Sequence, residues 1–251
     1  MIDEGDAHTH APDLKGRRAI VTGGTTGIGR AIAVPLASEG VKVFVCGRTT
    51  EHLDDALQRI AEVGDGDGIN VDLSIAEDID RFFEAAAAFL GGIDIAVINA
   101  AVPAAALADA GESEARYQLE TDFSAYLICA QEAARRMAGG SDMIFIGSMS
   151  AVSQKPGSSI YVAAKAGIQG FVPAFRKELA EADIKVGLIE PGFTGADFQY
   201  PEFPPEKQKA LINADKMLRA EDIAVAAHFM LTQPRRTAVS LIRVETRLEH
   251  P

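Results

Sequence analysis

The sequence predicts an α/β protein built on a doubly wound parallel sheet. Two observations indicate this class. From Lys15 onward, short runs that are apolar almost throughout alternate with stretches of helical periodicity, and a glycine-rich turn follows the first of these runs. A strand that is apolar on both faces is covered on both faces, which requires helices above and below the sheet. With 251 residues, 47% of them hydrophobic, the chain is long enough for one substantial domain.

We expect about seven strands, with a helical stretch between each strand and the next. The expected strands are Arg18–Thr22, Val41–Cys46, Gly68–Val71, Ile93–Asn99, Met143–Ser148, Lys185–Ile189 and Ser240–Val244. The expected helices are Gly27–Glu39, Glu51–Val63, Ile75–Leu90, Ser113–Ala138, Tyr161–Ala182 and Glu221–Leu231. Pro35 and Pro173 fall inside two of these helices, where an interior proline costs about 3 kcal/mol. We expect a local bend at each proline and no loss of either helix.

The ends of the chain and its hydropathy bear on domain organisation and location. Residues 1–13 lack periodicity and predict a flexible arm, followed by a single domain over residues 14–251. The first ten residues are polar and acidic, unlike a signal peptide. The most apolar stretch, Ile93–Ala106, is interrupted by polar residues and a proline, so we expect no membrane span and a cytoplasmic protein.

Charge and cysteine content exclude several classes of partner. The formal net charge is −12 and basic residues cluster only in pairs, which argues against a nucleic-acid partner. Cys46 and Cys129 both lie in apolar segments, so buried reduced thiols are expected. Two such cysteines cannot build a disulfide framework or a cysteine-rich metal site, and we expect no metal.

The glycine-rich turn Thr22–Gly29 reads T-G-G-T-T-G-I-G and leads from a predicted strand into a predicted helix. Unpaired N–H groups at a helix N-terminus, together with the helix dipole, favour an anion such as a pyrophosphate. A tight structural turn is the alternative interpretation, but the strand before and the helix after favour dinucleotide binding. The candidate binding residues here are Gly23, Thr25, Thr26, Gly27, Ile28 and Gly29.

Polar residues also follow the next three strands, at the edge where doubly wound sheets bind ligands. Arg48 and Thr49 follow the second strand, with no acidic residue before Glu51. An arginine here favours a cofactor with a phosphorylated ribose. The alternative interpretation is that Arg48 is a solvated surface residue. Asp72 ends the third strand, where it either accepts from an adenine amino group or caps the following helix. Asn99 ends the fourth strand, where its amide is placed to tie neighbouring loops together.

A candidate catalytic set follows the fifth strand. Tyr161 and Lys165 are one helical turn apart on one face, and Ser148 lies thirteen residues before Tyr161. A cation beside a phenol lowers its pKa from ~10 towards neutrality, which suits proton exchange with an alcohol or carbonyl oxygen. Ser148 is placed to hydrogen-bond the same oxygen. Without further context, a Tyr/Lys pair at this spacing more often forms a solvated helix face.

Together these residues resemble the short-chain dehydrogenase/reductase family. The matching parts, in the family's order, are Thr22–Gly29, Asp72, Asn99-Ala100-Ala101, Ser148, Tyr161-x-x-x-Lys165 and Pro191-Gly192, and they span the chain from about Leu14 to Val244. The resemblance implies a Rossmann-type sheet of seven parallel strands with three helices on each face. It also implies hydride transfer between a nicotinamide and a carbonyl or alcohol carbon.

The resemblance also implies a role for each matching residue. Tyr161 is the expected general acid for reduction, Lys165 lowers the pKa of Tyr161 and holds the nicotinamide ribose, and Ser148 orients the substrate oxygen. Arg48 matches the family's NADP-preferring pattern, so NADP(H) is the expected cofactor, with NAD(H) as the alternative. The further expected cofactor contacts are Thr49, Asp72, Leu73, Asn99, Ala100, Ala101, Pro191, Gly192, Phe193 and Thr194.

The chain departs from the family pattern at four points, one of which is the family's glycine-rich C-terminal signature, because Glu245–Pro251 is polar instead. The usual Asn-Asn-Ala-Gly reads Ile98–Ala101, a mild change if the backbone keeps φ negative. The family's fourth catalytic residue, an asparagine, falls at Asp122, and a carboxylate cannot donate as an amide does unless it is protonated. Asp122 also adds a charge near Lys165, which bears on the proton relay. The family's threonine after Pro-Gly appears as Ala196.

Residues 193–209 form a segment rich in proline and aromatic residues, at the place of the family's substrate lid. These aromatic residues either face an apolar substrate or pack as a surface loop, and the two interpretations are equally weighted. The expected helices 113–138 and 161–182 carry wide apolar faces. In similar proteins such helices form subunit contacts, so we expect a homo-oligomer, a dimer or a tetramer.

The leading hypothesis is an NADP(H)-dependent carbonyl reductase or alcohol dehydrogenase acting on a small molecule. Asp122 and Ala196 suggest an alternative, a catalytically weak nucleotide-binding protein that acts as a sensor or partner. The intact set Ser148, Tyr161 and Lys165 argues against that alternative. An epimerase or dehydratase on the same fold is a weaker third hypothesis, because no sizeable C-terminal sugar-binding region follows.

Overall fold

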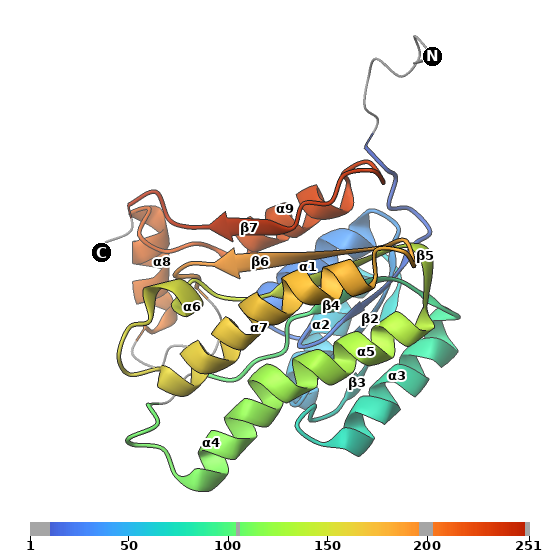
Figure 1. Cartoon of the computed structure of the whole chain (residues 1–251). Coiled ribbons are helices and arrows are strands. Elements are labelled where there is room, and N and C mark those ends of the chain that lie inside the picture. The colour runs from blue at the N-terminus through green and yellow to red at the C-terminus, as the bar shows by residue number, and fades with distance from the viewer. Residues whose placement is uncertain (1–10, 104–105, 196–202, 249–251) are drawn as a thin grey trace.

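The computed structural model describes residues 11–103, 106–195 and 203–248. Within these ranges, parallel strands form one seven-stranded sheet in the order β3-β2-β1-β4-β5-β6-β7 (Figure 1). The strands are β1 (Arg18–Val21), β2 (Lys42–Gly47), β3 (Gly66–Asn70), β4 (Ile93–Ile98), β5 (Met137–Ile146), β6 (Ile184–Pro191) and β7 (Leu241–Val244). The doubly wound parallel sheet expected from the sequence is confirmed.

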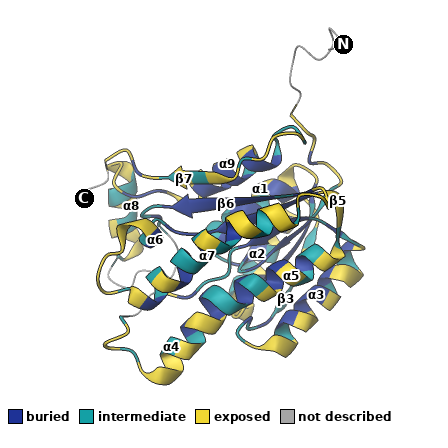
Figure 2. Ribbon diagram, in the orientation of Figure 1, coloured by how far each residue is buried: buried dark blue, intermediate teal, exposed yellow. Residues whose placement is uncertain are grey.

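Helices cover both faces of this sheet (Figure 1). One face carries α3 (Ala76–Leu90), α5 (Ala125–Arg136) and α7 (Ser159–Glu178). The other carries α1 (Gly27–Ser38), α2 (Thr50–Ala61) and α9 (Ala220–Leu231). Each face has its own buried core, and the central strands β1, β4 and β6 are almost entirely buried, whereas the edge strands β3 and β7 are not (Figure 2).

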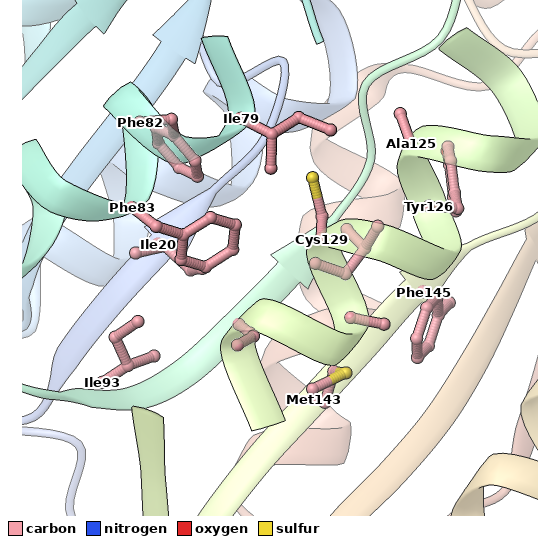
Figure 3. Close-up of a cluster of buried hydrophobic side chains, with 14 of the residues drawn as sticks. Ile20, Ile79, Phe82, Phe83, Ile93, Ala125, Tyr126, Cys129, Met143 and Phe145 are labelled. Carbon is pink, nitrogen blue, oxygen red and sulfur yellow. The ribbon is translucent and has the colours of Figure 1, made fainter. Parts of the chain in front are cut away.

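The apolar strands supply both cores because alternate side chains of a strand point to opposite faces. Ile20 of β1 belongs to the core beneath α3 and α5, whereas its neighbours Ala19 and Val21 belong to the core beneath α1 and α9. On the α3 and α5 side, Phe82 and Phe83 face the helix α5 across a dense cluster of apolar side chains (Figure 3). This packing explains why the strands read as continuous apolar runs.

The sheet reverses its winding direction between β1 and β4. The chain runs outward from β1 to β2 and β3, then returns to place β4 on the other side of β1 and continues to β7. Ligands of such sheets bind where the strand order reverses, at the carboxyl ends of the strands. The loops after Val21 and Ile98 meet at this point.

One long helix expected over residues 113–138 is interrupted. The structure has α4 (Glu112–Leu119), a π-helical turn η2 (Glu120–Ser124) and then α5, which ends at Arg136 because β5 begins at the next residue. A π turn accommodates one extra residue and so rotates the faces of the helix that follows. As a result, Asp122 and Tyr126 both face the interior.

The remaining differences concern helix content. Pro35 and Pro173 lie inside α1 and α7, and both helices continue past them, as expected. Two helices were not expected from the sequence: the short α6 (Ser150–Ser153) and α8 (Pro205–Asn213).

Most of the expected N-terminal arm, and part of the expected lid, lie outside the described residues. Among the residues that are described, no helix is both long and apolar enough to cross a bilayer.

Candidate active site

A cavity of about 740 Å³ opens at the carboxyl ends of the strands, where the strand order reverses. It collects almost all of the site residues expected from the sequence. Those lining it are Gly23, Thr25, Thr26, Gly27, Ile28, Arg48, Thr49, Asp72, Leu73, Asn99, Ala100, Ala101, Ser148, Tyr161, Lys165, Pro191, Gly192, Phe193 and Thr194. Two expected residues, Gly29 and Asp122, lie behind its wall.

The glycine-rich turn forms one end of the cavity. Gly23 and Gly27 have φ values of +62° and +50°, a region that side chains disfavour. Helix α1 begins at Gly27; its N-cap, Thr26, makes no side-chain capping hydrogen bond, and no acidic residue lies in the first turn. The first N–H groups of α1 are therefore available to an anion in the cavity. These features fit the pyrophosphate of a dinucleotide.

Asn99 joins the turn after β1 to the loop after β4. Its Nδ2 donates to the carbonyl oxygens of Thr22 and Gly23, at 3.0 and 3.1 Å. In return, Thr22 Oγ1 accepts from the backbone N–H groups of Asn99 and Ala100, at 2.8 and 3.1 Å. Neither Ala100 nor Ala101 is among the described non-glycine residues with positive φ, so alanine replaces the family's glycine without backbone strain.

Arg48 is held at the cavity rim by a chain of hydrogen bonds. Its guanidinium donates to the hydroxyl of Tyr117, which donates to Asp72 Oδ2 at 3.0 Å. Asp72 Oδ1 accepts from the backbone N–H and the hydroxyl of Ser74. Burial raises the pKa of Asp72, but the hydrogen bonds from Ser74 and Tyr117 and the charge of Arg48 outweigh it, and the net shift is downward. Asp72 therefore remains a carboxylate that organises this corner.

Lys165 is almost completely buried, with 1% of its surface exposed. Its Nζ donates to the hydroxyl of Tyr126 at 2.7 Å and to the carbonyl oxygen of Ile146 at 3.1 Å. The ring centroid of Tyr161 lies 5.5 Å from the same nitrogen. Burial lowers the pKa of Lys165 to about 8, and the charge of Asp122 opposes that shift. The expected pairing of Tyr161 with a cation on one helix face is present.

Asp122 faces away from the cavity, towards the protein interior. Its Oδ1 accepts from the backbone N–H of Val102 at 2.8 Å, and its Oδ2 accepts from Gln118 Nε2 at 3.3 Å. Burial raises the pKa of Asp122 to about 6, although the charge of Lys165 and these hydrogen bonds oppose the shift. Asp122 thus acts on the site through its charge on Lys165, while its neighbour Thr121 contributes to the cavity wall.

Ser148 lies at the end of β5 where the chain turns into α6. Its side-chain oxygen accepts from the backbone N–H of Ser150 at 3.0 Å, and the residue is 9% exposed. A hydroxyl that accepts from the chain keeps its own proton for another acceptor. Ser148 is therefore able to donate to an oxygen in the cavity.

Two aromatic side chains also line the cavity. Phe193 and Phe203 meet edge to face, with ring centroids 5.3 Å apart, and both line the cavity together with Lys155 and Lys216. Of the expected lid, residues 196–202 lie outside the described residues, including Ala196 and the aromatic side chains Phe198 and Tyr200. In the described part of the chain, no group of three or more His, Cys, Asp or Glu side chains is arranged to hold a metal ion.

Sequence reasoning missed two tyrosines that organise the site. Tyr117 bridges Arg48 and Asp72, and Tyr126 contacts Lys165. Tyr117 lies 69 residues from Arg48 along the chain, so no local spacing connects them. Tyr126 sits in an apolar helical stretch and reads as an ordinary core residue. Its position four residues after Asp122, one helical turn away, is the sequence feature that connects Tyr126 with the site.

Comparison with known proteins identifies the family. The sequence model of the short chain dehydrogenase family matches residues 17–207. The chain is 32% identical over 238 residues to an uncharacterized oxidoreductase of Staphylococcus aureus (strain USA300), covering 92% of this chain and 97% of the relative. It is 34% identical over 224 residues to the 3-oxoacyl-[acyl-carrier-protein] reductase FabG of Haemophilus influenzae, covering 86% and 91%.

Solved structures agree with this assignment. A short chain dehydrogenase from Burkholderia cenocepacia J2315, in complex with NADP, superposes with a TM-score of 0.82 at 26% identity, covering 93% of this chain and 98% of that one. A short-chain type dehydrogenase/reductase from Mycobacterium marinum gives a TM-score of 0.81 at 29% identity, covering 93% and 95%. The chain belongs to the short-chain dehydrogenase/reductase family and is an oxidoreductase of that family.

Proposed function

We propose that this protein transfers a hydride between NADP(H) and a carbonyl or secondary alcohol, with Tyr161 as general acid and base. One observation carries the proposal. Ser148, Tyr161 and Lys165 line the same cavity as the glycine-rich turn and Arg48, so a dinucleotide held on the turn would extend towards the three candidate catalytic groups. When bound, the nicotinamide supplies or accepts the hydride.

The chain's own residues supply the proton and the orientation. Ser148 donates a hydrogen bond to the substrate oxygen, which fixes the carbonyl beside Tyr161. During reduction the Tyr161 hydroxyl donates its proton to that oxygen, and the Lys165 ammonium stabilises the phenolate that remains. The reverse direction uses the same groups, with the Tyr161 phenolate as base.

Three groups of residues would hold the cofactor. The N–H groups at the start of α1 would hold the pyrophosphate, together with Thr25, Gly27 and Ile28, which line the cavity there. Arg48 would pair with the 2′-phosphate of NADP(H), because a guanidinium is suited to bidentate contact with phosphate. Pro191–Thr194 would line the nicotinamide. The NADP complex of the Burkholderia relative supports the choice of cofactor.

The test measures NADPH and NADH oxidation against a broad panel of aldehydes and ketones, with cofactor affinity followed separately by fluorescence. The proposal expects NADPH oxidation with at least one class of carbonyl and weaker oxidation of NADH. Tight cofactor binding with no turnover over the panel would favour a catalytically weak sensor or partner protein instead.

We further propose a cytoplasmic homo-oligomer, a dimer or tetramer. Leu119 on α4 and Ile128 on α5 are large apolar side chains more than two-fifths exposed, which supports subunit contacts on these helices. Cys46 and Cys129 are free and buried, which suits a reducing compartment. Light scattering tests the assembly, and a monomeric mass would contradict it.

A further inference from the structure

We propose that Tyr126 is a positioning residue whose hydroxyl holds the Lys165 side chain in place and keeps it in its charged form. Its importance for turnover rests on the proposed function. Its effect on Lys165 itself can be measured without any turnover. The inference stands on the hydrogen bonds that surround one buried hydroxyl.

The Tyr126 hydroxyl has three partners. It lies 2.9 Å from the carbonyl oxygen of Asn99, 3.0 Å from the carbonyl oxygen of Ile146 and 2.7 Å from Lys165 Nζ. Carbonyl oxygens only accept, and the hydroxyl has a single proton. That proton is therefore used on the carbonyl side, and towards Lys165 the hydroxyl is restricted to accepting.

A hydroxyl that can only accept favours the ammonium over the neutral amine. A hydrogen bond from a charged donor is stronger than one from a neutral donor. The Tyr126 ring adds to this preference, because its centroid lies 4.2 Å from Lys165 Nζ and ring faces attract cations. Both contacts are weakened when Lys165 loses its proton.

The charged and titratable groups around Lys165 come from three elements. Asp122 belongs to η2, Tyr126 to α5 and Tyr161 to α7 itself, while Arg48 acts on Asp122 from the loop after β2. Burial raises the pKa of Tyr126 well above its usual value, and the neighbouring Tyr161, Asp122 and Cys129 raise it further. The Tyr126 hydroxyl therefore stays neutral and acts as an acceptor, not as an acid or base.

The same contacts fix where the ammonium lies. Tyr126 Oη and the Ile146 carbonyl take two of the three N–H groups of Lys165, which leaves one for the cavity that Lys165 lines. Through its single hydroxyl, Tyr126 also joins the ends of β4 and β5 to α7. Tyr126 occupies this position at the start of α5, two residues after the π turn η2.

The test follows the titration of Lys165 by NMR on the folded full chain labelled with ¹³Cε-lysine, using Lys165→Met to assign the signal. The wild-type midpoint is expected near the value of about 8 set by burial. Tyr126→Phe removes the acceptor and keeps the ring, so the midpoint is expected to fall by roughly half a pH unit or more. Cys129→Ala is the control, because Cys129 is equally buried on the same helix (Figure 3).

Should Tyr126→Phe fail to fold, 3-fluorotyrosine at position 126 replaces it, since the fluorine weakens the oxygen as an acceptor with little change in shape. A smaller shift in the same direction is then expected. An unchanged Lys165 midpoint in these proteins, or an equal shift in Cys129→Ala, overturns the proposal. A shifted midpoint in a protein that oxidises no NADPH supports the role of Tyr126 and counts only against the proposed function.

Discussion

The backbone of Gly29 lies directly against the carbonyl of Gly23. A Cβ built on Gly29 would approach that oxygen to 2.2 Å and Asn99 Nδ2 to 2.6 Å. Gly29 therefore acts behind the cavity wall, where the first helix meets the turn after β1. The close approach fixes the shape of the glycine-rich turn, and it leads to a direct prediction.

Gly29→Ala should destabilise the protein and weaken cofactor binding, because the backbone of the turn has to move to admit the methyl group. Overpacking of this kind costs about 1–3 kcal/mol. Gly170→Ala is the matched control: its Cβ meets no atom within 4 Å in helix α7, so it should stabilise by about 0.5–1 kcal/mol. Thermal unfolding and NADPH titration measure both effects, and equal effects of the two variants would contradict the prediction.

Arg48→Ala should reduce kcat/KM for NADPH by roughly 10–100-fold and leave that for NADH nearly unchanged, because only NADPH carries the 2′-phosphate. Steady-state kinetics with each cofactor measure this ratio. Arg59→Ala is the control, since Arg59 lies on α2 and its side chain is half exposed away from the cavity. A proportional loss with both cofactors would show that Arg48 does not select between them.

The pH dependence of carbonyl reduction should show a basic limb near pH 8. Burial lowers the pKa of Lys165 to about 8, so its charge is present below that pH and is lost as the pH rises through it. Without the charge, the Tyr161 phenolate formed in the reaction is less stabilised. A profile of kcat/KM against pH checks this, with Lys177→Met on the exposed side of α7 as control. A limb that first appears near pH 10 would be inconsistent with a buried ammonium.

The free energy of unfolding of the wild type should fall as the pH rises from about 4 to about 6, whereas that of Asp122→Asn should not fall in this way. Burial raises the pKa of Asp122 from 3.8 to about 6, so the folded wild type binds more protons than the unfolded chain in this window. Its stability therefore falls as the pH rises through the window, by an amount of order 1–3 kcal/mol. Urea unfolding at a series of pH values measures the difference. The same trend in Asp54→Asn, an exposed carboxyl on α2, would exclude Asp122 as its source.

The sequence was sufficient for those parts of the site that depend on local geometry. The glycine-rich turn lies between a strand and a helix, so its place at the end of the strand follows from the sequence. Tyr161 and Lys165 are one helical turn apart, so regular helix geometry places them on the same face. Their convergence with Ser148 and Arg48 follows from parallel strands, whose carboxyl ends all meet at one edge of the sheet.

Other parts depend on contacts that no spacing encodes. The π turn at Glu120–Ser124 interrupts a stretch that the sequence predicts as one continuous helix, and Tyr126, two residues after this turn, contacts Lys165. Arg48 contacts Tyr117, which lies 69 residues further along the chain. The two oxygens of Asp72 accept hydrogen bonds from Ser74 and from Tyr117, which belongs to α4.

The central claim is that the Tyr161 hydroxyl transfers the proton at the reaction centre. Tyr161→Phe removes this hydroxyl alone, and cofactor affinity and turnover can be measured on the same preparation. We predict that NADPH affinity changes by less than about threefold while kcat for carbonyl reduction falls by roughly 10²–10⁴-fold. A Tyr161→Phe protein that reduces the same carbonyl at the wild-type rate would contradict the account.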